Sequence, residues 1–296
     1  MIAIEAPART GQLLVGGRPV GWAEWGLSDG SVVVFCTGAA MTSSLGFGFA
    51  ALRELGVRLV CVDRAGLGRS APDPDKSFAS YTADVATVLR RLGITRAAAV
   101  GFSQGGPFAV ALAAAGVVSR VALVAATDEL AHPSMRGQLV PDVARMADAI
   151  ASDPRGFEAA FEAQVDAEGL WALVLGMSAP SDRAIYEQPA FAAAFRQTLY
   201  EGFARGPAGY VRDVVLATSP WPTPPEAITA PVYLWYGSLD TSPVHSPDAG
   251  ATLARRFPCA TRHVLSDEGG SLLWTQGQAI LAALVGEPVG DRAPVR

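Results

Sequence analysis

Histidine and cysteine are both scarce in this sequence, with three of each among 296 residues. The cysteines, Cys36, Cys61 and Cys259, lie far apart, and two of them fall inside apolar runs typical of strands. This spacing argues against a disulfide framework, and no Cys-x-x-Cys or His-x-His pair offers a metal site. We therefore expect buried, reduced thiols, a reducing compartment and no metal.

Charge is also sparse. Charged residues make up 17% of the chain, and the formal net charge is −5 with a pI near 5.3. Without a cluster of Lys and Arg, we expect no nucleic-acid partner. No run of 18 apolar residues could span a membrane, and the first ten residues do not read as a secretory signal. The expectation is a cytoplasmic protein without a membrane partner.

Nucleotide-binding motifs are missing as well. No Gly-x-Gly-x-x-Gly follows the first predicted strand, and the glycines Gly66 and Gly68 open a loop instead. We therefore expect no cofactor.

Short apolar runs alternate with helical patterns at both ends of the chain. The predicted strands cover residues 12–15, 20–25, 31–36, 57–63, 97–102, 120–126, 231–237 and 261–265, and the predicted helices between them cover 49–55, 81–92, 107–115, 247–257 and 271–285. Strands separated by helices predict βαβ units and an α/β fold with a mostly parallel sheet.

The alternation stops between residues 128 and 226, where the pattern is helical throughout. We interpret this stretch as a helical cap, or lid, inserted after the sixth strand, with residues 1–127 and 227–296 forming the core. Both ends of the insertion fall at a sheet edge where ligands of open α/β sheets bind. The alternative is a separate helical domain with its own task.

A strand, a Gly-x-Ser-x-Gly motif and a helix follow one another between residues 97 and 115. The motif is Gly101-Phe102-Ser103-Gln104-Gly105. In this context it predicts a nucleophile elbow, a turn so tight that the serine is strained and the glycines must lack side chains. The turn raises the Ser103 hydroxyl above the sheet, beside the positive end of a helix.

Together with two further segments, this elbow resembles the α/β-hydrolase superfamily. The segments are Asp63-Arg64-Ala65-Gly66-Leu67-Gly68-Arg69-Ser70, similar to the family's D-R-x-G-x-G-x-S loop, and Leu234-Trp235-Tyr236-Gly237-Ser238-Leu239-Asp240, similar to the end of its seventh strand. The resemblance covers residues 11–285 and implies a sheet of about eight strands with helices on both faces.

The resemblance also implies roles for particular residues. Ser103 matches the nucleophile and Asp240 the acid of a catalytic triad. The family's oxyanion hole is made of backbone N–H groups, which here correspond to those of Gln104 and, in the loop Thr37-Gly38-Ala39, of Ala39.

The family's histidine, which follows its last strand, has no counterpart: Gly270 stands at that place. A serine hydroxyl needs a base to take its proton, so the sequence predicts an incomplete triad with a vacant histidine position at Gly270. On this interpretation, Gly270→His should raise turnover.

Other groups could substitute for the missing base. His245, five residues after Asp240 and near the predicted sheet edge, is the best substitute, although we favour a plain absence. His263 is expected to be structural and His132 to lie in the cap. The nearby carboxylates Asp267 and Glu268 are weaker alternatives as bases, and Asp128 is an alternative acid.

These features favour a hydrolase of small apolar ester or acyl substrates, working through Ser103 with an incomplete or unusual triad. Two alternatives remain: an impaired relative that binds a small apolar ligand, and a lyase or isomerase that uses the oxyanion hole alone. A small apolar molecule is the expected partner because the cap is rich in large apolar side chains. They are Phe157, Phe161, Trp171, Met177, Phe191, Phe195, Tyr200 and Phe203.

Overall fold

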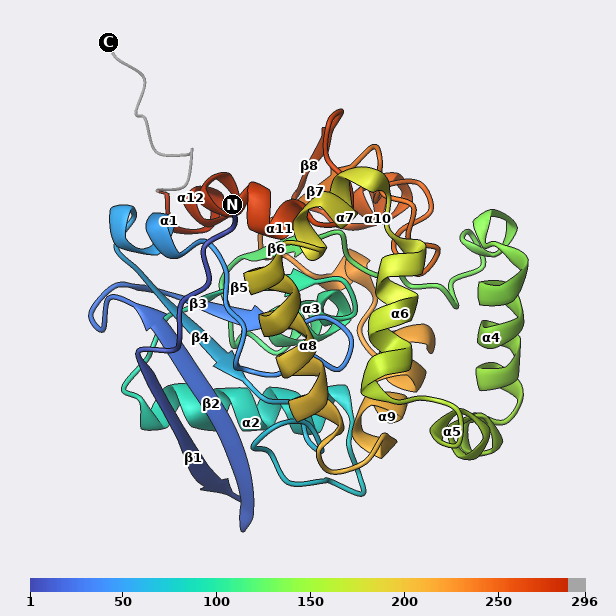
Figure 1. Ribbon diagram of the computed structural model, residues 1–296, viewed down its shortest axis with the longest axis horizontal. Helices are drawn as coiled ribbons and strands as arrows, with labels where there is room; N and C mark the ends of the chain where they lie inside the picture. Colours follow the sequence, from blue (N-terminus) through green and yellow to red (C-terminus); the bar gives the residue numbers. More distant parts are fainter. Residues whose placement is uncertain (287–296) are drawn as a thin grey trace.

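The computed structural model describes residues 1–286 and contains a sheet of eight strands in the order β1-β2-β4-β3-β5-β6-β7-β8 (Figure 1). Their bounds are β1 Arg9–Val15, β2 Arg18–Gly26, β3 Ser31–Cys36, β4 Val57–Val62, β5 Ala98–Phe102, β6 Val121–Val124, β7 Val232–Gly237 and β8 Ala260–Leu265. The pairs β1–β2 and β2–β4 are antiparallel, and all other pairs are parallel. The predicted α/β fold class is therefore confirmed.

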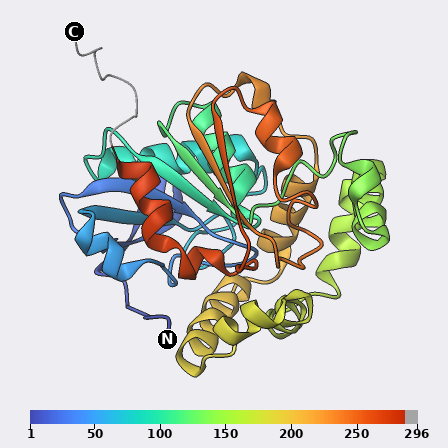
Figure 2. The same ribbon diagram turned by 90° about the horizontal axis from the view of Figure 1, so that it is seen from above.

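Helices cover both faces of this sheet (Figure 2). One face carries α1 Phe49–Glu54, α11 Leu272–Thr275 and α12 Gly277–Val285, and the other carries α2 Phe78–Arg91, α3 Gly105–Ala114 and α10 Ala251–Arg256. Every residue of β4, β5 and β6 is buried, which explains why these strands are apolar along their whole length, except for Arg58 in β4, rather than alternating.

Six helices lie between β6 and β7 and are called the inserted helices below. They are α4 Pro141–Ser152, α5 Pro154–Glu162, α6 Ala167–Met177, α7 Pro180–Tyr186, α8 Pro189–Phe203 and α9 Ala208–Thr218. They gather on one side of the molecule (Figures 1 and 2).

An aromatic cluster joins the inserted helices to the core around Trp274 of α11. Its ring centroid lies 4.8 Å from that of Phe102 at the end of β5 and 4.9 Å from that of Phe191 in α8. Tyr186 and Phe195 complete the cluster, each with its centroid 5.9 Å from Trp274. The position of α8 is thus coupled by packing to the residue that precedes Ser103.

The ends of some helices differ from the sequence-based prediction. The predicted helix 271–285 is interrupted at Gln276, and α10 begins at Ala251 rather than at residue 247. Within the stretch predicted to be helical, α7 has only seven residues, and its first turn carries Pro180, Ser181 and Asp182. No helix within residues 1–286 combines the length and apolarity needed to cross a membrane.

Trp274→Ala should lower the free energy of unfolding by about 3–5 kcal/mol, because it leaves a cavity at the junction of core and inserted helices. Urea unfolding followed by circular dichroism measures the change. Leu14→Ala is the control, since Leu14 is 69% exposed and should change stability by less than about 0.5 kcal/mol. Equal effects of the two substitutions would contradict the proposed importance of this junction.

Candidate active site

Ser103 occupies the turn between β5 and α3 with φ of 50°, a left-handed conformation that is uncommon outside glycine. Hydrogen bonds hold the turn: Ser103 N donates to Val124 O at 3.1 Å, while Ser103 O accepts from Gly106 N and Thr127 N, each at 3.0 Å. A strained conformation kept in place in this way is typical of functional sites.

The glycines of the motif are required by close backbone approaches. A Cβ on Gly105 would lie 2.0 Å from Cys36 O at the end of β3, and a Cβ on Gly101 would lie 2.7 Å from Gly106 Cα. The helix can therefore pass directly over the strands, which places Ser103 beside the N-terminus of α3.

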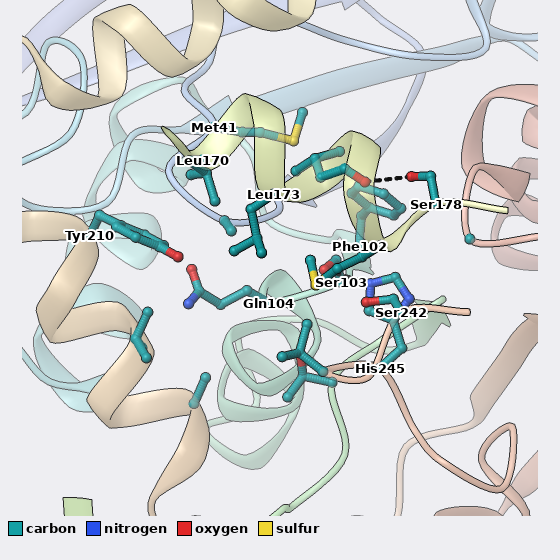
Figure 3. A pocket seen from close by; sticks show the side chains of 18 of the residues that line it. Met41, Phe102, Ser103, Gln104, Leu170, Leu173, Ser178, Tyr210, Ser242 and His245 are labelled. Atoms are coloured by element: carbon teal, nitrogen blue, oxygen red, sulfur yellow. Dashed lines mark hydrogen bonds between the residues drawn. The ribbon is translucent and has the colours of Figure 1, made fainter. Parts of the chain in front are cut away.

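A continuous hydrogen-bonded chain runs from Ser103 through His245 to Asp240. His245 Nε2 lies 2.9 Å from Ser103 Oγ, and His245 Nδ1 lies 2.7 Å from Asp240 Oδ2. Figure 3 shows the imidazole beside Ser103 among the residues that line a pocket. The expectation that no imidazole reaches Ser103 is therefore wrong.

Asp240 and His245 both come from the loop that follows β7. Burial of Asp240 favours the protonated carboxyl, but the His245 charge and hydrogen bonds from His245 and Ser242 N outweigh it and lower the Asp240 pKa below its ordinary value. An anionic Asp240 can accept a hydrogen bond from Nδ1–H of His245, and in that tautomer the unprotonated Nε2 can accept one from the serine hydroxyl.

The loop is held in place on the far side of His245. Ser246 Oγ donates to Asp128 Oδ2 at 2.8 Å, and Ser246 N donates to Ala126 O at 3.1 Å. Burial raises the Asp128 pKa. Asp128, considered above as an alternative acid, contacts the residue after His245 rather than the imidazole.

Gly270 lies on another side of Asp240. A Cβ built on Gly270 would be 3.1 Å from Asp240 Oδ1, and Gly270 N donates to Oδ2 of Asp182 in α7 at 3.1 Å. Ser271 N donates to the other Asp182 oxygen at 2.8 Å. The segment considered for a family histidine is thus tied to an inserted helix.

The remaining candidate bases have other surroundings. His263 stacks on Trp235 with ring centroids 4.1 Å apart, and its partial burial lowers its pKa. His132 Nδ1 lies 2.7 Å from Ser134 Oγ in an exposed position. Glu268 accepts from Thr275 and Gln276, and Asp267 is exposed. None of the four lines the pocket that contains Ser103.

Ala39 and Gln104 both line the pocket beside Ser103. Within residues 1–286, neither backbone N–H donates to another protein group. Two free N–H groups beside Ser103 can donate hydrogen bonds to an oxygen that becomes negative during a reaction. In the same described part of the chain, no group of three or more His, Cys, Asp or Glu is arranged to hold a metal ion.

The pocket encloses about 180 Å³ between the sheet and the inserted helices. Its wall is mostly apolar, and all six inserted helices contribute to it. The large apolar side chains include Met146, Phe161, Leu170, Leu173, Val174, Tyr186, Phe195, Tyr210 and Val214 from these helices and Met41 and Phe102 from the core. Figure 3 shows the Gln104 amide pointing toward the Tyr210 hydroxyl.

The sequence pattern predicted the tight turn at Ser103 and the loop that carries Asp240. It gave His245 only as a possible substitute base, behind the absence of any base. The predicted helix 247–257 begins two residues after His245, whereas α10 begins only at Ala251 and His245 lies in the preceding loop. The available signal was its spacing of five residues from Asp240 in a chain with so few histidines.

Comparisons with known proteins agree with this architecture. A family model described as alpha/beta hydrolase fold matches residues 31–276. Among solved structures, a bromoperoxidase from Bacillus anthracis is 18% identical with a TM-score of 0.67, covering 94% of this chain and 100% of that one.

Two further solved structures have names that mention ester chemistry. An enol-lactonase from Burkholderia xenovorans LB400 is 21% identical, TM-score 0.65, over 92% of this chain and 98% of its own. An esterase from Rhodococcus sp. ECU1013 is 22% identical, TM-score 0.62, over 97% and 99%. At these identities the likeness concerns the fold. No curated protein sequence matched the chain.

Gly105→Ala should destabilise the protein by about 1–3 kcal/mol or more, because its methyl group would overlap the Cys36 carbonyl oxygen. Thermal and urea unfolding measure the loss. Gly137→Ala is the matched control, since a Cβ there meets nothing within 4 Å. If Gly105→Ala were as stable as Gly137→Ala, the tight elbow described here would be wrong.

Proposed function

This chain belongs to the α/β-hydrolase fold family, and on that basis we propose that it is a serine hydrolase of small carboxylic esters with an apolar acyl group. The observation that carries the proposal is the hydrogen-bonded chain Ser103–His245–Asp240. Nucleophile, base and orienting acid at these distances form the arrangement that activates a serine.

In the proposed mechanism, Ser103 Oγ attacks the ester carbonyl while His245 Nε2 takes its proton. The carbonyl oxygen becomes negative and accepts hydrogen bonds from the N–H groups of Ala39 and Gln104. His245 then returns the proton to the departing alcohol, which leaves an acyl group on Ser103. A water molecule, deprotonated by His245, releases the carboxylic acid and restores the serine.

The substrate class follows from the pocket. A wall made mainly of apolar side chains around about 180 Å³ favours a short apolar acyl chain over a sugar or a phosphate. We propose that the inserted helices act as a cap, since they supply most of this wall and exclude water from the reacting atoms. The alternative of a ligand-binding relative without a base is less well supported, because Ser103 has an imidazole partner.

Ser103→Ala and His245→Ala should each lower kcat for p-nitrophenyl butyrate by roughly 10⁴-fold or more, and Asp240→Asn by roughly 10³- to 10⁴-fold. Labelling of Ser103 by a fluorophosphonate, read by mass spectrometry, should slow in His245→Ala to a similar degree. His263→Ala and His132→Ala are the matched controls and should stay close to the wild-type rate.

Two results would contradict this assignment. One is a His245→Ala variant that keeps the wild-type rate. The other is a wild-type protein that neither hydrolyses short esters nor reacts with the phosphonate at Ser103. In the second case, a rise in melting temperature with an apolar ligand would favour the ligand-binding alternative.

Gly270→His should lower ester turnover rather than raise it. The new imidazole would crowd Asp240, whose carboxylate lies 3.1 Å from the added Cβ, and would compete with His245 for the acid. Steady-state kinetics should show at least about a tenfold fall in kcat, as expected when the acid of a triad is disturbed. Gly137→His, at an open position, controls for the added side chain. A rise in kcat would restore the idea of a vacant histidine position.

A further inference from the structure

Arg64, from the segment that resembles the D-R-x-G-x-G-x-S loop, has no part in the mechanism above, yet its side chain is 1% exposed. It lies beneath the loop that carries Ala39. Nη1 donates to Thr37 O at 2.6 Å, and Nη2 donates to Gly38 O at 2.7 Å. The guanidinium also sits over the ring of Phe108 in α3, 5.0 Å from its centroid.

The contact with Gly38 O bears directly on Ala39. The Gly38 carbonyl and the Ala39 N–H belong to one peptide group, and no peptide bond in the described residues is cis. In a trans peptide the C=O and N–H point in opposite directions. Because the guanidinium holds the Gly38 carbonyl on one side of the peptide group, the Ala39 N–H points to the opposite side, where Ala39 lines the pocket.

The positive charge of Arg64 has a second effect on the Gly38–Ala39 peptide group. A hydrogen bond from a cation to the carbonyl polarises the peptide group and strengthens its N–H as a donor. Arg64 thus acts on the same donor in two ways, through direction and through strength, without touching the substrate.

The guanidinium is itself fixed by an inserted helix. Arg64 Nε donates to Oδ2 of Asp213 in α9 at 2.8 Å, and Asp213 is fully buried. The other Asp213 oxygen forms an ion pair with Lys76 Nζ at 2.7 Å. Because α9 also carries Tyr210 and Val214 of the pocket wall, one helix both lines the pocket and holds the guanidinium that bonds the Gly38 carbonyl.

The inserted helix α8 holds the same loop from another side. Thr42 N donates to Thr198 Oγ1 at 2.8 Å, and a Cβ on Gly202 would lie 1.9 Å from Ala40 O. Ala40 has φ of 52°, so the loop bends sharply directly after Ala39. The path of this loop thus depends on contacts with both the core, through Arg64, and the inserted helix α8.

We propose that Arg64 is a positioning residue for catalysis, which orients and polarises the Gly38–Ala39 peptide group so that the Ala39 N–H stabilises the oxyanion, and that Asp213 of α9 holds Arg64 in this role. The proposal rests on the function proposed above. It requires that Arg64 affect the transition state while leaving substrate binding nearly unchanged.

Arg64→Lys tests the proposal, with Arg58→Lys as the matched control. Arg58 is also buried, pairs with buried Glu24 at 2.7 Å and donates to a carbonyl, that of Ser28, but it lies at the start of β4 outside the pocket. Lysine keeps the charge and loses the planar fork that reaches two carbonyls and a carboxylate together.

Arg64→Lys should lower kcat for p-nitrophenyl butyrate roughly 10- to 100-fold and leave KM within about threefold. The upper end of this range approaches the effect of losing one oxyanion donor altogether. The inhibition constant of butylboronic acid, whose serine adduct is tetrahedral and places an oxygen at the oxyanion position, should rise by a similar factor. Arg58→Lys should change neither quantity by more than about threefold, even where its melting temperature falls equally.

Thr37→Val provides a second test if Arg64→Lys does not reach the wild-type circular dichroism spectrum. It removes the Thr37 hydroxyl, which accepts from Arg64 Nη1 at 3.2 Å and donates to Met41 O at 2.9 Å, and it keeps the side-chain volume. The loss of the hydrogen bond to the guanidinium, together with the one inside the loop, should lower kcat about three- to tenfold and weaken boronic acid binding in parallel, with KM unchanged.

Equal effects of Arg64→Lys and Arg58→Lys, or a rise in KM with unchanged kcat, would overturn the proposal while leaving the triad assignment intact. For Thr37→Val, unchanged kcat and boronic acid binding would overturn it as well. Failure of the proposed function looks different: the wild-type protein would show no activity that depends on Ser103, and the role of Arg64 would fall with it.

Discussion

The hydrogen bond between His245 and Asp240 is the interaction on which the candidate site depends. Both residues lie in one loop after β7, five positions apart, so one backbone path sets the distance between the proposed base and the proposed acid. The path is fixed at several points, by Ser242 N on Asp240 and by Ser246 on Asp128 and Ala126. Asp128, close to the end of β6, thereby supports the loop of His245 without a hydrogen bond to the imidazole. The imidazole reaches Ser103 because this loop and the elbow lie at the same edge of the sheet.

The inserted helices contribute more than a wall over the pocket. Asp182 of α7 accepts from two backbone N–H groups beside Asp240, Asp213 of α9 binds Arg64, and α8 packs on Trp274 next to Phe102. Each contact joins an inserted helix to a segment adjacent to a candidate catalytic group. A change in the packing of these helices would therefore change the geometry of the site as well as the shape of the pocket.

The sequence predicted the fold class and the elbow because both depend on local patterns. Buried parallel strands leave apolar runs, and the tight turn at Ser103 demands glycines at fixed positions. The position of the proposed base, His245, follows no such rule. His245 reaches Ser103 only through the irregular path of residues 238–250, which includes Ala249 at φ 51° and Gly250 at φ 76° and has no periodicity to read. The family pattern has its histidine in a different loop, after the last strand, and therefore predicted a vacant position at Gly270. Likewise, nothing in the spacing of Arg64 and Asp213, 149 positions apart, predicts their contact.

A crystal structure of the protein after reaction with a small alkyl phosphonate is the sharpest test of whether His245 is the base that serves Ser103. If it is, phosphorus will be bonded to Ser103 Oγ, the phosphoryl oxygen will face the N–H groups of Ala39 and Gln104, and His245 Nε2 will lie within hydrogen-bond distance of the serine oxygen or the departing group. An adduct on Ser103 with His245 turned away and another side chain in its place, or an adduct on a different residue, would contradict this role of His245.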